Sequence, residues 1–186
     1  MAGSYEELSA AFNQSARDFL RMEPDAAWLV TRYTALLKFK ATTEEQKADV
    51  VKTLCTCFED YLKKYTKPDL TWISPESEAN LQRLSAALKA PETLKRIGDK
   101  TAQSLADLSI DLLDQAKRME DNDSIPYKNR SDYYHKLTRF AGFALSTAEA
   151  FQAEITAREV DVKTSKNISP AKRITLKAAN EGGPQP

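Results

Sequence analysis

The chain has 186 residues, of which 41% are hydrophobic and 29% are charged. This composition is typical of one globular domain with a buried core and speaks against an intrinsically disordered chain. Lysine and arginine together number 27, as do aspartate and glutamate, so the net charge is zero. A free-standing nucleic-acid-binding domain usually carries a basic excess, and the balance therefore disfavours that class without excluding a local basic patch.

No segment approaches the roughly 20 consecutive apolar residues that a transmembrane helix needs. The first residues, MAGSYEELSAAF, carry acids where a signal peptide carries bases, and no apolar stretch follows them. We therefore expect no membrane partner and a cytoplasmic location, or a place in the virion if the chain is a viral coat subunit.

Apolar residues recur at intervals of three and four in nearly every segment, which predicts helices and no sheet. The first helix is expected to begin at Ser4, because SYEE has the spacing of a capping box with Glu7 three residues on. A second helix is expected near Pro24, a favourable residue for a first helical turn. The segment TTEEQ should cap a third helix, and Ser74-Pro75 should open a shorter fourth.

Each of these helices has a stripe that should be buried. The stripes consist, in chain order, of Tyr5, Leu8, Phe12, Ser15 or Ala16, and Phe19; Trp28, Leu29, Leu36, Leu37 and Phe39; Val51, Leu54, Phe58, Tyr61 and Tyr65; and Leu81, Leu84 and Leu88.

Two long helices are expected in the second half of the chain. One begins at Pro91 and runs for roughly thirty residues, or about 45 Å, with apolar residues spaced from Leu94 to Met119. The other is expected from Asn129 to Arg158. Short connections between such helices imply antiparallel neighbours, so the sequence predicts an all-α antiparallel bundle of about five to six helices.

Residues 163–186, KTSKNISPAKRITLKAANEGGPQP, depart from this spacing. Their charged residues are five bases and a single acid: Lys163, Lys166, Lys172, Arg173, Lys177 and Glu181. Five bases against one acid give this segment a charge of +4, so the rest of a neutral chain carries −4. We therefore predict a helical bundle domain at 1–162 and an irregular basic arm at 163–186. Because opposite charges attract, the arm of one copy is suited to lie on the body of the next.

The two cysteines, Cys55 and Cys57, lie in LCTCF. Two cysteines and one histidine cannot supply the four ligands of a structural zinc site within one chain. Residues two apart on a helix point about 200° apart, which is unsuited to a disulfide between them. We expect free thiols that are buried or half buried.

The only histidine, His135, follows Arg130 by five residues in NRSDYYHK. Arg-x4-His at the beginning of a helix in an all-α domain resembles the signature of the HEPN ribonucleases, although Ser131 stands where the commonest form has asparagine. The resemblance covers six residues. It implies a metal-independent ribonuclease in which the arginine stabilises a phosphate and the histidine transfers protons, usually across a dimer interface. The competing interpretation is a helix start capped by Asn129 or Ser131, with a partly exposed His135. The two side chains lie about 140° apart on a regular helix, which favours that interpretation.

Asp107, Asp111 and Asp114 share one face of a predicted helix, a spacing at which carboxylates can hold a divalent cation. No second helix offers a matching acidic face, and a single histidine rules out the paired Glu-x-x-His motifs of di-iron bundles. We interpret the aspartates as a solvated, salt-bridged face with Arg118 one turn beyond Asp114. No metal or other cofactor is expected.

The segment DYYHKLTRFAGF mixes aromatic and basic residues, as nucleic-acid-binding surfaces do. Tyr133 and Phe140 fall on the predicted buried stripe, which leaves Tyr134, Arg139 and Phe143 as candidates for an interaction surface. A core or oligomer interface is the favoured interpretation of these residues, and nucleic-acid binding is the second.

The chain has no glycine-rich phosphate loop, no nucleophile elbow and no cysteine–histidine pair. The sequence therefore favours a non-enzymatic helical protein that self-associates or docks on another protein. A viral coat or nucleoprotein subunit and a phage or bacterial adaptor are examples of that class. The alternative is the HEPN-like ribonuclease that would use Arg130 and His135.

Overall fold

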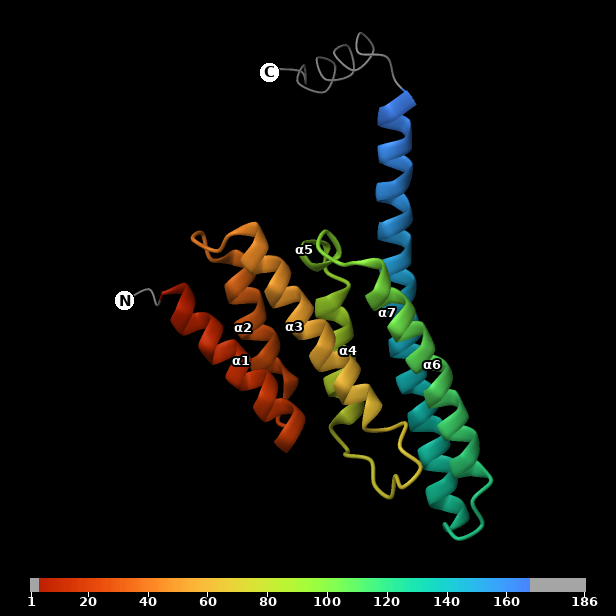
Figure 1. The fold of residues 1–186 in the computed structure, drawn as a ribbon. Helices are drawn as coiled ribbons and strands as arrows, with labels where there is room; N and C mark the ends of the chain where they lie inside the picture. The colour runs from red at the N-terminus through yellow and green to blue at the C-terminus, as the bar shows by residue number, and fades with distance from the viewer. Residues whose placement is uncertain (1–3, 168–186) are drawn as a thin grey trace, which may run out of the picture.

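The computed structural model describes residues 4–167, and the side chains of residues 4–164. Within this range the chain forms seven α-helices and no strand, which confirms the predicted all-α class (Figure 1). The helices are α1 (Tyr5–Met22), α2 (Ala26–Lys38), α3 (Glu44–Lys63), α4 (Ser77–Leu88), α5 (Pro91–Leu94), α6 (Asp99–Glu120) and α7 (Tyr127–Asn167).

Two helices begin at the capping boxes that their sequences predict. The Ser4 side chain accepts the backbone N–H of Glu7, and the Glu7 side chain accepts the backbone N–H of Ser4. Thr43 and Gln46 make the same reciprocal pair at the start of α3. Each pair satisfies two backbone donors that a helix N-terminus otherwise leaves free.

The start of α2 lies slightly later than predicted. Asp25 is the N-cap residue and accepts the backbone N–H of Ala27, so Pro24 precedes the cap instead of lying in the first turn. The side chain of Asn80, in α4, accepts the N–H of Ala26 at 2.9 Å and donates to the carbonyl of Pro24 at 3.3 Å. A long-range contact therefore fixes where this helix begins.

The prediction of one helix of about thirty residues from Pro91 is wrong. The segment forms the four-residue α5, a turn at 95–98, and then α6. Gly98 is the N-cap of α6 and has an extended backbone, a conformation that ends one helix before the next begins. Arg158, from α7, donates to the carbonyls of Leu94 and Ile97 and so satisfies groups that a continuous helix would have bonded internally.

Helix α7 is longer than predicted at both ends. It runs for 41 residues, from Tyr127 to Asn167, whereas the sequence suggested a helix from Asn129 to Arg158. The first five residues of the expected irregular arm, 163–167, are therefore helical. No glycine or proline interrupts the chain there before Pro170, and adding residues to an existing helix is far easier than starting one.

Helices α6 and α7 form a long antiparallel hairpin beside the other helices (Figure 1). Within the hairpin the two helices pack closely on each other, while α6 also packs on α3 and α7 on α4. The C-terminal part of α7 extends past the rest of the described chain (Figure 1). None of the described helices combines the length and the apolar character that crossing a membrane requires.

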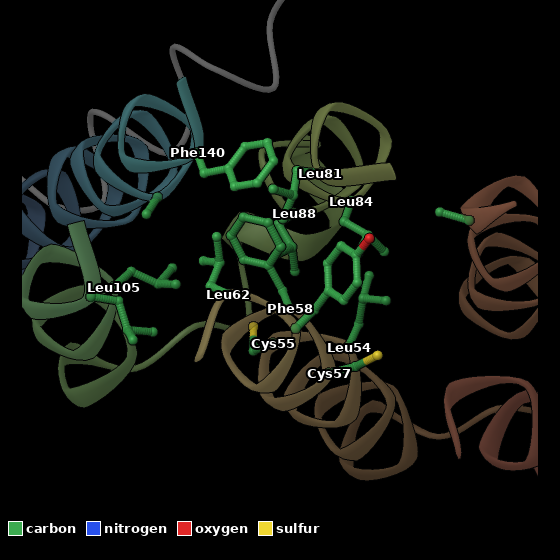
Figure 2. Close-up of a cluster of buried hydrophobic side chains, with 14 of the residues drawn as sticks. Leu54, Cys55, Cys57, Phe58, Leu62, Leu81, Leu84, Leu88, Leu105 and Phe140 are labelled. Carbon is green, nitrogen blue, oxygen red and sulfur yellow. The ribbon is translucent and has the colours of Figure 1, made fainter. Parts of the chain in front are cut away.

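One continuous core joins the helices. Its apolar side chains come from α1, α2, α3, α4, α6 and α7, and Figure 2 labels those of α3, α4, α6 and α7. Four aromatic rings link α1 to α7 within it. Phe19 packs on Tyr61 with ring centroids 4.7 Å apart, Tyr61 on Tyr65 at 5.6 Å, and Tyr65 on Phe140 at 5.0 Å. The stripes predicted for α3 and α4 are buried throughout.

Trp28 is an exception to the predicted stripes, because 69% of it is exposed. The buried residues of α2 are Ala26, Leu29, Tyr33 and Leu36, which recur at steps of three and four. Trp28 precedes Leu29 by one residue and therefore points about 100° away from that face.

Candidate interaction surface

Arg130 holds the turn between α6 and α7. Its Nη1 donates to the carboxylate of Asp123 at 2.7 Å and to the carbonyl of Glu120 at 3.3 Å. Its guanidinium also lies 5.9 Å from the ring centroid of Tyr127. The side chain is only 20% exposed. This arrangement gives Arg130 a structural role at the start of α7.

His135 lies on the exposed side of α7, where its ring meets the edge of Tyr134 at 5.7 Å between centroids. Since Arg130 bonds to groups at the turn, the structure does not bring Arg130 and His135 together within one chain. The joint action of the pair that the HEPN resemblance implies would need a second copy to supply one of the two residues.

Asp107, Asp111 and Asp114 are all exposed on α6, as predicted. Asp107 accepts a hydrogen bond from Gln103 at 2.8 Å. Over residues 4–164, no ion pair joins Arg118 to Asp114, so the predicted salt bridge of this face is wrong. The same residues contain no group of three metal-ligating side chains.

Cys55 and Cys57 are free and buried, as predicted. They leave α3 in different directions (Figure 2), and the Cys57 sulfur lies 3.9 Å from the Ala16 carbonyl of α1. Burial raises the pKa of each thiol to about 12. Both therefore remain protonated at neutral pH, and neither has the thiolate that a nucleophile or metal ligand requires.

Tyr134, Arg139 and Phe143 do not form one aromatic and basic platform. Arg139 bonds through Nη1 to both carboxylate oxygens of Glu78, in α4, at 2.9 and 3.0 Å. Tyr134 and Phe143 are half buried against the core. They are nine residues apart, which puts them on opposite edges of α7.

The bases of the predicted arm are only partly described. Lys163 is exposed near the end of α7, and Lys166 lies in the last turn of that helix. Lys172, Arg173 and Lys177 lie outside the described residues.

An exposed apolar surface that the sequence did not predict runs along the α6–α7 hairpin. Ile110 is 59% exposed, Leu113 47% and Leu145 44%. Next to Leu145 a groove of about 150 Å³ opens between the two helices, and Ala106 contributes to its lining. Ala106, Ile110 and Leu113 follow one another at steps of four and three, so they share a side of α6. We call Ala106, Ile110, Leu113 and Leu145 the hairpin face.

Acidic residues border the hairpin face. Asp107 and Asp114 are exposed beside it on α6, and Glu149 lines the groove from α7. Over residues 4–164, none of these three carboxylates forms an ion pair with a described base. The hairpin face is therefore an apolar strip bordered by these three carboxylates, while Lys117, one turn beyond Leu113, pairs with Glu120 and Asp121.

The projecting end of α7 exposes further apolar residues. Val160 is 54% exposed and Val162 is 51% exposed. A shallow cleft of about 430 Å³ lies here, lined by Arg158, Glu159, Val162 and Lys163. A separate apolar spot, with Met22 and Trp28, lies at the corner between α1 and α2.

Comparisons with protein-family models, with curated proteins and with solved structures give no match to this chain. The fold and the surface together define an all-α protein whose longest helical hairpin presents an apolar face with an acidic border.

Proposed function

We propose that the chain is a non-enzymatic α-helical assembly protein, whose first partner is another copy of itself. The hairpin face carries this proposal. Single exposed leucines are ordinary on a soluble monomer, but Ile110, Leu113 and Leu145 lie along neighbouring helices beside a groove. Contiguous apolar surface with a polar border is typical of protein–protein interfaces.

The projecting part of α7 supports the same proposal. A helix that extends past its packing partners gains little from tertiary contacts, and most helical stability in proteins comes from such contacts. Val160 and Val162 remain more than half exposed there. A neighbouring subunit that covered them would stabilise this segment.

Sedimentation equilibrium of the full chain over a wide concentration range tests the proposal. We expect reversible self-association, and we expect the double variant Ile110→Asp/Leu113→Asp to weaken it by about tenfold or more, because a carboxylate in an apolar contact loses its hydration. Met22→Asp is the matched control, since Met22 is 60% exposed but distant in the chain from the hairpin.

Circular dichroism checks that each variant is still folded. A full chain that stays monomeric at every concentration and salt level would overturn the proposal. So would a double variant that associates as strongly as the parent.

A further inference from the structure

The C-terminal arm contains a segment whose chemistry complements the hairpin face. Residues 172–177 read KRITLK, so three bases surround Ile174 and Leu176. We propose that this segment of one copy binds the hairpin face of a neighbouring copy. The inference rests on the proposed self-association and names the occupant of the interface.

The groove offers a place for the apolar residues of the segment. Its lining includes the small side chains of Ala102, Ala106 and Ala148, with Leu145 at the edge. The groove has a volume of about 150 Å³. An apolar cavity of about that size holds benzene, so the groove suits a branched aliphatic side chain. Residues two apart in an extended segment point to the same side. Ile174 and Leu176 could therefore face the apolar strip together.

The charges of the two surfaces also match. Asp107, Asp114 and Glu149 border the hairpin face, and over residues 4–164 none of them forms an ion pair. The segment 172–177 supplies three bases and no acid. Complementary charge at the border of an apolar contact sets which partner binds and in which register.

Chain length limits how much of the hairpin face the segment can reach within its own copy. Leu176 is nine residues past Asn167, and at up to ~3.6 Å per residue an extended chain spans at most about 32 Å. Leu145 lies 22 residues back along α7, or about 33 Å at 1.5 Å per residue. Ile110 and Leu113 lie still nearer to the turn of the antiparallel hairpin. Within one copy the segment can therefore just reach Leu145 and the groove beside it, but not Ile110 and Leu113. On a neighbouring copy the segment has no such limit and can cover the whole hairpin face.

A charge exchange between full-length chains tests this arrangement. The face variant carries Asp107→Lys, Asp114→Lys and Glu149→Lys, and the arm variant carries Lys172→Glu, Arg173→Glu and Lys177→Glu. We expect each variant alone to self-associate about tenfold more weakly than the parent at low salt, because like charges then oppose each other. An equimolar mixture should regain association, since each arm then meets a face of opposite charge.

A charge-matched control carries Glu45→Lys, Asp49→Lys and Asp69→Lys, which are exposed positions outside α6 and α7. We expect this control to associate like the parent. An arm variant that associates normally would overturn the inference while leaving self-association in place. A mixture that fails to regain association would likewise overturn binding between copies. A parent chain that is monomeric throughout would instead refute the proposed function itself.

Discussion

Asn80 binds the first turn of α2 through Ala26, a residue 54 positions earlier in the chain, with 2.9 Å between its Oδ1 and the backbone nitrogen. Asn80 is only 1% exposed, and Ala26 is fully buried. Asn80→Ala would leave the Ala26 N–H without a partner and should lower the free energy of unfolding by about 1–3 kcal/mol. Urea unfolding measures this, with the exposed Asn129→Ala as control. Equal losses in the two variants would contradict the prediction.

Two leucines of α6 provide a matched test of the core. Leu108 is 5% exposed and Leu113 is 47% exposed. Leu108→Ala should cost about 2–5 kcal/mol of stability because it leaves a cavity. Leu113→Ala should cost about 0.5 kcal/mol or less in the monomer. Chemical denaturation at low protein concentration compares them, and a Leu108→Ala protein as stable as the parent would show that the α6 stripe is misassigned.

Glu59 should make stability depend on pH. Burial raises the pKa of its carboxyl group above the usual value, although Ser104 Oγ donates a hydrogen bond to it at 3.0 Å. Below the pKa of the unfolded state, the Glu59 carboxyl group is protonated in both the folded and the unfolded chain, and its titration does not lower the free energy of unfolding. As pH rises through the carboxyl range, the unfolded chain releases its proton more readily, so stability falls.

Glu59→Gln removes this pH-dependent loss of stability, because glutamine does not ionise. The variant should melt higher than the parent near neutral pH, and the difference should shrink at a pH below the carboxyl range. The exposed Glu45→Gln serves as control. Thermal melts at both pH values make the comparison, and a gain that persists unchanged in acid would contradict the assignment to Glu59.

The Arg130 and His135 pair can be tested by folding and by RNA cleavage. His135→Ala should leave the melting temperature unchanged, because the side chain is exposed. Arg130→Ala should cost about 1 kcal/mol, since it removes the ion pair with Asp123. We expect no RNA cleavage by the parent. Metal-independent cleavage of single-stranded RNA that both variants abolish would establish the ribonuclease instead.

Removing the arm should affect association and not folding. The predicted domain boundary after Val162 lies inside α7, which continues to Asn167. A truncation that removes the arm without cutting this helix therefore ends at Asn167. A chain ending at Asn167 should melt like the parent but lose its salt-sensitive association, as the screening length falls from about 10 Å at 0.1 M to about 3 Å at 1 M. If the shortened chain unfolds, the arm belongs to the core. If it associates normally, the interface lies elsewhere.

The features that could be predicted are those that depend on neighbours in the sequence. The capping boxes at Ser4 and Thr43 need only a residue three positions on, and the stripe of α3 needs only its own spacing. The break at Gly98 was missed because Arg158, from the end of the chain, satisfies the carbonyls of the turn. No local pattern shows that contact.

The hairpin face was missed for a related reason. Helix α6 has apolar residues on two sides, and the spacing of Leu105, Leu108 and Leu112 identifies only the buried one. Ile110 and Leu113 fall between those positions and would be buried if another helix covered them. Which side of a two-sided helix stays open depends on how many neighbours surround it, and that is a property of the whole fold.

The exposed position of Trp28 has a consequence for spectroscopy. Trp72 is also exposed, at 63%, and the chain has two tryptophans in all. Both indoles therefore already face water in the folded monomer, and their emission maximum should shift little when the protein unfolds. A shift of that emission towards shorter wavelength on raising the protein concentration would instead report that a subunit has covered one of these two indoles.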